Sequence, residues 1–167
     1  MPTTINGTSG DNYLTAPDGG VYVLNGLGGN DHLLGGSGTN HMSGGLGNDT
    51  LQAGSGVNFM LGDTSPSNPA AGGKDTFIVS LNALKAGAAV TVFDFGGAGG
   101  YAASDNDFMA FTGFSAGSWI SSVTDSKVDS HLAYYTLHDN LSGLEFTVAI
   151  RSTNGHHLGA GDFNFYH

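Results

Sequence analysis

Single apolar residues recur at a fixed interval through the first third of the chain. After one step of ten residues the interval is nine in four successive steps, and the apolar residues are Leu14, Leu24, Leu33, Met42, Leu51 and Met60. They belong to consecutive nine-residue copies at 26–34, 35–43, 44–52 and 53–61, with weaker copies at 7–15 and 17–25. A fixed period indicates like units that stack and share one core. The pattern therefore predicts a coil of short strands, each of which turns one apolar side chain inward.

The pattern changes beyond this segment. Residues 62–69 interrupt the repeat with Pro and Ser and predict a surface loop. Aromatic and β-branched runs typical of strands follow, at 90–95, 108–114, 132–137, 144–150 and 163–166, and only 81–86 has a helical composition. An open coil end exposes its apolar column and strand edges, so a cap is required. We predict an all-β protein: a parallel β-roll over residues 1–79 and a C-terminal β-rich cap over 80–167, folded together as one unit.

Composition then limits the chemistry. The chain has 167 residues with 29 glycines and no cysteine, and 14 acidic residues face only 4 basic ones. The net charge of −10 argues against nucleic acid, because phosphate binding needs clustered Lys and Arg. No apolar run approaches the length of a membrane-spanning helix, so no membrane insertion is expected. Without cysteine, a metal site must use oxygen or histidine ligands.

Glycine and aspartate hold fixed positions in the copies, as in Gly44-Gly-Leu-Gly-Asn-Asp49. This pattern resembles the G-G-x-G-x-D-x-U-x nonapeptide of RTX proteins, which implies a calcium-binding parallel β-roll. Glycines at positions one, two and four permit backbone turns that a Cβ forbids, and they let carbonyl groups approach an ion. One turn of such a coil holds two copies, so alternate copies share an edge. The sixth positions then form one edge with Asn12, Asp31, Asp49 and Asp75 and an opposite edge with Tyr22, Asn40 and Asn58.

Only the first edge carries carboxylates, and calcium takes about six to eight oxygen ligands with compensating negative charge. We predict one calcium site between the loops 26–31 and 44–49, and a second between Asp49 and the loop 72–75. The predicted ligands are the side chains of Asp31, Asp49 and Asp75 and the carbonyl groups of Leu27, Gly29, Gly45, Gly47 and Gly73. Asn12 with Asp31 gives a third, poorer site.

The opposite edge has a different expectation. Stacked Asn40 and Asn58 predict a side-chain hydrogen-bond ladder, because an amide carries both donors and an acceptor. This edge should therefore bind calcium weakly or not at all.

The second half extends the resemblance with Gly72-Gly-Lys-Asp-Thr-Phe77, Val92-Phe-Asp-Phe95 and the run from Asp105 to Phe114. Together with the repeats, these segments look like the non-catalytic R-modules of secreted mannuronan (alginate) C5-epimerases. The resemblance implies calcium binding, type I secretion to an extracellular location, and an attached or partner enzyme. The chain departs from the family pattern by having asparagine at half of the sixth positions.

We therefore predict a non-catalytic module that folds when calcium binds outside the cell and that supports secretion and stability of a catalytic partner. The alternative is a carbohydrate-binding module for alginate or another polyuronate. A chain of this charge repels a polyanion, so such binding needs bridging calcium or bases gathered on one face. Those bases are Lys74, Lys85, Lys127 and Arg151. Met1 is compatible with a complete protein and with a piece of an enzyme.

A catalytic interpretation rests on Gly113-Phe-Ser115-Ala-Gly117, which matches the G-x-S-x-G nucleophile elbow, with His131 and His138 downstream. That motif requires a strand, a sharp turn and a helix within a large α/β sheet. The chain predicts neither the helix nor that sheet. We interpret the match as chance and Ser115 as a loop residue of the cap.

Histidine offers few metal sites. His32 and His41 occupy outward positions on opposite faces of the predicted coil and cannot share an ion, and His156-His157 lies in a predicted turn. We expect no zinc or nickel site.

The remaining aspartates are weaker candidates. Asp94, Asp105 and Asp107 form an acidic group near the end of the coil, which either holds another calcium or caps turns. Asp18 and Asp63 lie in loops near the ligand edges and rank lower.

Overall fold

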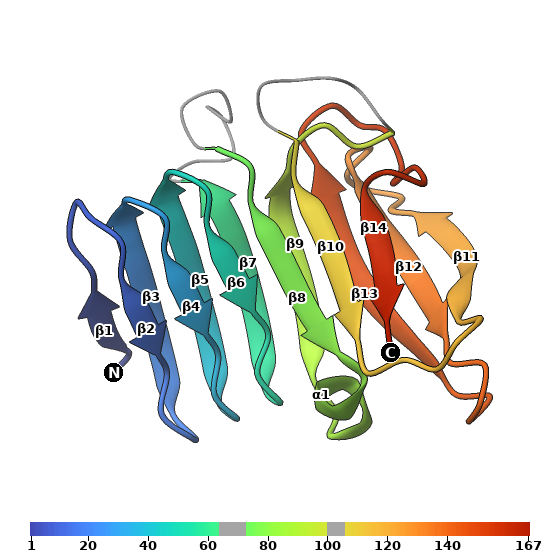
Figure 1. Cartoon of the computed structure of the whole chain (residues 1–167), viewed down its shortest axis with the longest axis horizontal. Coiled ribbons are helices and arrows are strands. Elements are labelled where there is room, and N and C mark those ends of the chain that lie inside the picture. The colour runs from blue at the N-terminus through green and yellow to red at the C-terminus, as the bar shows by residue number, and fades with distance from the viewer. Residues whose placement is uncertain (64–72, 100–105) are drawn as a thin grey trace.

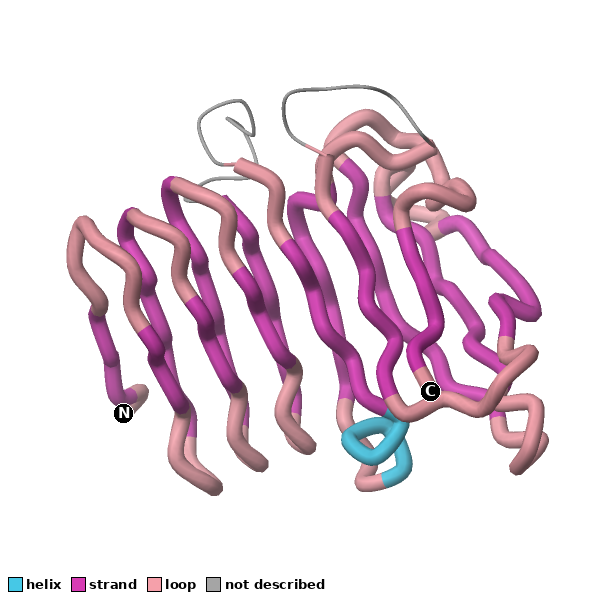
Figure 2. Tube along the Cα trace, viewed as in Figure 1, coloured by secondary structure: helices cyan, strands magenta, loops and turns pink. Residues whose placement is uncertain are grey.

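The computed structural model describes residues 1–63, 73–99 and 106–167 (Figures 1 and 2). Most of the predicted loop at 62–69 lies outside these residues, as do Gly72 and Asp105. No helix in the described segments is long and apolar enough to cross a membrane.

Two sheets face each other along the molecule (Figure 1). The eight-stranded sheet has the order β1 (Thr3–Asn6), β3 (Val21–Gly28), β5 (Thr39–Leu46), β7 (Val57–Asp63), β9 (Ala89–Phe95), β13 (Glu145–Ser152), β12 (Leu132–His138) and β11 (Trp119–Asp125). The six-stranded sheet has the order β14 (Phe163–Tyr166), β10 (Phe108–Thr112), β8 (Thr76–Ser80), β6 (Thr50–Gln52), β4 (His32–Leu34) and β2 (Tyr13–Thr15). Pairing is parallel except at β13–β12 and β12–β11. The predicted all-β parallel β-roll is confirmed.

The register explains why a nine-residue repeat builds this coil. Alternate copies stack on one another, so Leu33 lies opposite Leu51 in the six-stranded sheet and Met42 lies opposite Met60 in the eight-stranded sheet. These side chains are buried and form a narrow internal column. Phe77 continues the first stack, opposite Leu51.

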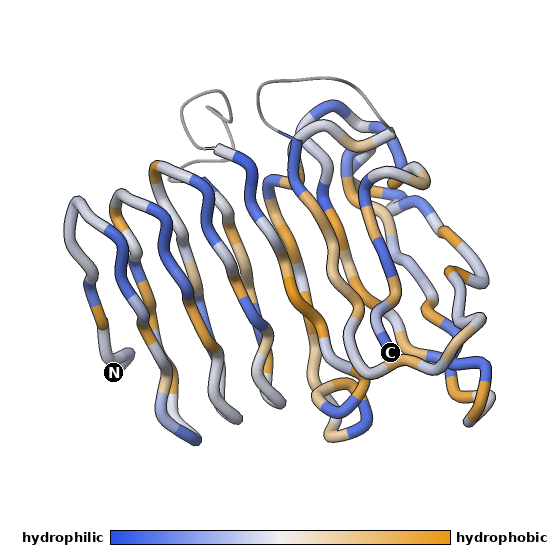
Figure 3. The backbone as a smooth tube through the Cα atoms, in the orientation of Figure 1, coloured by the Kyte–Doolittle hydropathy of each residue, from blue (hydrophilic) through white to orange (hydrophobic). Residues whose placement is uncertain are grey.

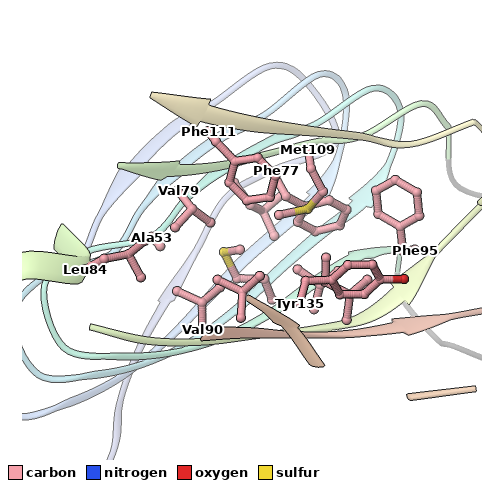
Figure 4. Packing of buried hydrophobic residues seen from close by; sticks show 14 of the residues in the cluster. Ala53, Phe77, Val79, Leu84, Val90, Phe95, Met109, Phe111 and Tyr135 are labelled. Atoms are coloured by element: carbon pink, nitrogen blue, oxygen red, sulfur yellow. The ribbon is translucent and has the colours of Figure 1, made fainter. Parts of the chain in front are cut away.

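Both sheets run from the roll into the cap without a break, because β7 pairs with β9 and β8 pairs with β10. The core widens there around large side chains that include Phe77, Phe95, Phe111 and Tyr135 (Figure 4). In Figure 3 the strands at this end are more strongly hydrophobic than the glycine-rich loops of the roll. Aromatic residues fill this wider space because each buries more area than Leu or Met.

The single helix of the described residues, α1 (Leu81–Lys85), forms where the sequence predicted it and ends one residue earlier. Ser80 caps it, since its hydroxyl accepts the backbone N–H of Ala83. Two strands were not predicted, β1 and β11. Most residues of β11 are exposed on both faces, so this strand lacks the apolar alternation that reveals a half-buried strand.

Candidate metal centre

The loops before β4, β6 and β8 place three aspartates in one row, at the upper edge in Figure 1. A carboxylate oxygen, Oδ1, of each residue accepts a backbone N–H from the preceding coil. Asn12 donates to Asp31, Asp31 to Asp49, and Asp49 to Asp75, each at 2.7 Å. We call Asp31, Asp49 and Asp75 the carboxylate row. The predicted stacking of these residues on one edge is thus present.

The second oxygen of each carboxylate has no hydrogen-bond donor. Oδ2 of Asp31, Asp49 and Asp75 is buried without a partner, and these residues are only 2%, 1% and 1% exposed. Buried acceptors are normally satisfied, because an unsatisfied one loses its hydration without compensation. Three such oxygens in register therefore point to a cation as their missing partner.

Glycine at position one makes room for these oxygens. A Cβ on Gly26, Gly44 or Gly62 would overlap Oδ2 of Asp31, Asp49 or Asp75, respectively. The carbonyl oxygen of Gly44 also lies at this space beside Gly26. Each free oxygen thus packs against an α-carbon at a position that only glycine can occupy.

The predicted carbonyl ligands lie between successive loops. The carbonyl oxygens of Leu27, Gly29 and Gly47 pack against the α-carbons of Gly45, Gly47 and Gly73, where a Cβ would clash. Carbonyl groups from one loop thus face the next loop along the row. No three His, Cys, Asp or Glu side chains converge on one point among the described residues. A site on this row must therefore combine carboxylates with such carbonyl groups, a donor set that suits calcium.

Leu27 has an unusual backbone. It is the one residue other than glycine with a positive φ in the described segments, at 80°. It pairs with Gly45, whose φ is 119°, so these two stacked residues share the left-handed conformation. The conformation carries a cost for leucine, since a Cβ crowds the backbone there.

Electrostatics along the row favour a cation. Burial raises the pKa of Asp31, raises the pKa of Asp49 to about 6 and raises the pKa of Asp75 to about 8. The backbone hydrogen bonds oppose this effect, while neighbouring carboxylates add to it. Without a positive partner the ionised row is therefore unfavourable, and a divalent ion would compensate its charge.

Asn12 differs from the row. Its Oδ1 accepts the backbone N–H of Thr8 and contacts the Thr8 hydroxyl. This side chain already has hydrogen-bond partners, so the proposed third site of Asn12 with Asp31 lacks the free oxygen that marks the other steps.

The opposite edge satisfies its own hydrogen bonds. Asn40 Nδ2 donates to Asn58 Oδ1 at 3.1 Å and to the Gly36 carbonyl at 3.0 Å. Asn58 Oδ1 also accepts the Gly54 N–H at 3.0 Å. The predicted asparagine ladder is confirmed, with Tyr22 opposite Asn40 at its first step. Neither asparagine has an unpartnered buried atom.

The repeat segment matches a known family of calcium-binding repeats. Residues 23–51 and 34–64 match the model of the RTX calcium-binding nonapeptide repeat, which comprises four copies. The repeats are RTX repeats. The match includes Asp31 and Asp49 and ends before Asp75 and the cap. No curated protein matches the chain. Residues 23–64, the RTX segment, thus match a family of calcium-binding repeats, which is one of ion-binding repeats rather than of catalysts.

The carboxylate edge of the roll contains a second ladder of hydrogen bonds that the sequence analysis missed. Asp11 Oδ1 accepts the N–H of Asn30 at 2.7 Å, and Asn30 Oδ1 accepts the N–H of Asn48 at 2.8 Å. Asn48 Oδ1 in turn accepts the N–H of Lys74 at 2.8 Å. The signal was present, because Asp or Asn occupies position five only in the copies of the carboxylate edge. This ladder ties the loops of that edge together beside the row.

The row also extends into the cap. The N–H of Asp75 donates to Asp107 Oδ1 at 2.8 Å, which repeats the geometry of the RTX segment. Asp107 Oδ2 accepts the N–H of Gly96 at 2.8 Å. Asp94, of the same predicted acidic group, accepts the N–H groups of Gly62 and Asp63. Asp94 and Asp107 thus join the cap to the last coil of the roll.

Ser115 does not have the surroundings of a nucleophile. Its hydroxyl donates to Asp139 Oδ1 at 2.8 Å and accepts the N–H of Leu141 at 2.8 Å. Hydrogen bonds from Ser115 and Ser142 hold the pKa of Asp139 well below its usual range. The segment follows β10 and leads to β11, without the helix of a nucleophile elbow. Ser115 and Asp139 tie two cap loops together.

Five of the histidines have separate aromatic or acidic partners. His32 stacks on Tyr13 in the six-stranded sheet, whereas His41 stacks on Phe59 in the eight-stranded sheet. His131 and His138 approach Asp129 and Glu145 at 3.8 and 3.5 Å. His157 Nε2 lies 2.6 Å from Asp125 Oδ1. Within the described part of the chain these residues form no shared metal site.

Proposed function

We propose that this protein is a non-catalytic module that folds when calcium binds to its RTX segment outside the cell. The observation that carries the proposal is the set of three buried carboxylate oxygens without donors, one each on Asp31, Asp49 and Asp75. Each packs against the α-carbon of a glycine at position one of the repeat. Calcium supplies the positive charge that this arrangement lacks, and the loops supply carbonyl oxygens beside it.

Two ions account for the sequence-derived ligands. The first is held by Asp31 and Asp49 with the carbonyl groups of the loops 26–31 and 44–49, those of Leu27, Gly29, Gly45 and Gly47. The second is held by Asp49 and Asp75 with the carbonyl group of Gly73. Asp49 belongs to both sites, since it is the middle member of the row.

The energetics favour folding coupled to binding. Without calcium, the row is buried and repels itself, and ordering a glycine-rich chain costs much backbone entropy. A site whose Kd lies about 100-fold below the calcium concentration stabilises the fold by about 2.7 kcal/mol, and two such sites by about 5 kcal/mol. That gain is comparable with the whole stability of a small domain.

This coupling suits export. A chain that stays largely unfolded in a calcium-poor cytosol and folds outside can pass through a type I secretion channel and then stabilise an enzyme attached to it. The RTX segment supports this proposal, together with the resemblance of the chain to modules of alginate epimerases.

The polyuronate alternative finds less support. Lys74 and Lys85 flank opposite ends of β8, the latter in α1. Arg151 is already paired with Asp129 at 2.9 Å. These bases do not gather on one face, so a polyanion would have to bind through bridging calcium.

The test is far-UV circular dichroism of the full chain during calcium addition, followed by an excess of chelator, with magnesium as the control ion. We expect β signal to appear with calcium, to disappear with chelator and to respond little to magnesium, which demands a smaller octahedral site. An unchanged β signal after calcium removal would contradict folding on calcium. Titration with alginate oligomers at fixed calcium tests the alternative.

A further inference from the structure

The carboxylate row has three free carboxylate oxygens, one more than the number of proposed calcium sites. The free oxygen of Asp31 and the carbonyl oxygen of Gly44, which belongs to the coil of Asp49, both pack against the α-carbon of Gly26. The free oxygen of Asp31 therefore lies on the side of the next coil toward the cap. The N–H groups of Asp49 and Asp75 repeat the hydrogen bond of Asp31 along the row, so we extend this arrangement to them. The free oxygen of Asp75 is then placed toward the first coil of the cap, which contains Asp107.

The residues around the free oxygen of Asp75 differ from those in the repeats. Asp63 pairs with Gly45 and so occupies position two, where a carboxylate replaces the glycine of the repeat. Asp94 lies on the neighbouring strand β9, and its two carboxylate oxygens accept the N–H groups of Gly62 and Asp63 at 3.0 and 2.9 Å. Asp63 is 3% exposed and Asp94 is 1% exposed. The junction between roll and cap therefore concentrates buried carboxylates.

These groups lie close to Asp75. Its free Oδ2 lies against Gly62, the residue directly before Asp63. Asp63 and Asp94 are both near enough to interact with Asp75 electrostatically. Asp75 is 1% exposed, and its Oδ2 has no donor. A buried carboxylate oxygen that has no donor and has further buried carboxylates nearby lacks the partner that a cation supplies.

We propose that the roll–cap junction binds a further divalent cation of the calcium class, with Asp63 and Asp75 as its carboxylate ligands. Asp94 positions Asp63 through the backbone, and Asp107 positions Asp75 in the same way. The site rests on the proposed calcium function and goes beyond it, because it lies where the repeat ends. Its consequence is that the cap and the roll fold as one calcium-dependent unit.

The experiment counts the calcium ions bound to the full chain by native mass spectrometry and measures their affinities by calorimetry. Asp63→Gly restores the residue type of the repeat at position two, and Asp63→Asn keeps the size of the side chain. Asp18→Asn is the control, because it removes an exposed carboxylate that lies on the opposite edge, beside Ser37. We expect both Asp63 variants to lose one ion, or to bind it about tenfold more weakly or worse, while the other ions remain.

A second readout follows the cap. Amide hydrogen exchange of β9 and β10 should be slowed by calcium in the wild type and much less so in the Asp63 variants. Unchanged calcium number and affinity in both Asp63 variants would overturn the junction site while leaving the RTX sites intact. A wild type that binds no calcium would instead overturn the proposed function itself.

Discussion

The two edges of the roll start from the same nonapeptide and differ mainly at position six. Asparagine on one edge donates and accepts within the coil, so Asn40 and Asn58 complete their hydrogen bonds without a ligand. Aspartate on the other edge accepts one N–H and leaves an oxygen buried and unpartnered. One atom per repeat, an amide nitrogen in place of a carboxylate oxygen, therefore separates a self-sufficient edge from one that needs a cation.

The largest effect is expected when Asp49, the middle member of the carboxylate row, is replaced by the asparagine of the opposite edge. Asp49→Asn keeps an oxygen for the Asp31 N–H but removes the charge shared by two sites. With calcium at about 100-fold above Kd, we expect a loss of about 5 kcal/mol of unfolding free energy. In chelator both the variant and the wild type should lack the β signal, because neither has a cation on the row. Urea denaturation in saturating calcium measures the loss, and an unfolding free energy equal to that of the wild type would contradict it.

The reverse change should create a requirement for calcium on the silent edge. Asn40→Asp removes the amide donor to Asn58 and to the Gly36 carbonyl and adds a buried charge. At the lowest calcium concentration that folds the wild type, we expect a destabilisation of about 1–3 kcal/mol from the unsatisfied groups. Higher calcium should recover part of it. A loss independent of calcium would show that the carboxylate alone does not make a site.

Calcium-free stability should depend on pH. The pKa of Asp49 is raised to about 6 and that of Asp75 to about 8, so the folded row binds protons that the unfolded chain releases. The stability contributed by these groups is therefore present in acid and is lost as pH rises through about 6 and then about 8. Far-UV circular dichroism in chelator should therefore show the strongest β signal at pH 5 and progressively less at pH 7 and pH 9. The trend should vanish in saturating calcium, and a rise with pH in chelator would count against it.

The smallest expected effect concerns the backbone of the row. Leu27→Gly removes the strain of a φ of 80° at position two, and the side chain is 50% exposed, so little packing is lost. We expect a gain of up to about 1 kcal/mol in thermal denaturation. Leu46→Gly is the matched control, since Leu46 is 49% exposed and has no positive φ. It should destabilise through added chain entropy. Equal effects of the two changes would contradict strain at Leu27.

The nine-residue period predicted the coil. The resemblance to RTX repeats, in which one turn holds two copies, then predicted the two edges and the asparagine ladder. The junction could not be predicted in this way. Asp107 joins the row across an insertion that contains α1 and β9, and Asp94 meets Asp63 only through pairing of β7 with β9. Residues brought together across such distances leave no local pattern. The strand β11 was missed for a different reason: most of its side chains are exposed, so apolar and polar residues do not alternate along it.

The most direct test is a crystal structure grown with calcium, with anomalous difference density measured along both edges. The account predicts peaks between Asp31 and Asp49, between Asp49 and Asp75, and beside Asp63 and Asp75. It predicts no peak between Asn40 and Asn58. Absence of density along the carboxylate row, or equal density on the two edges, would contradict it.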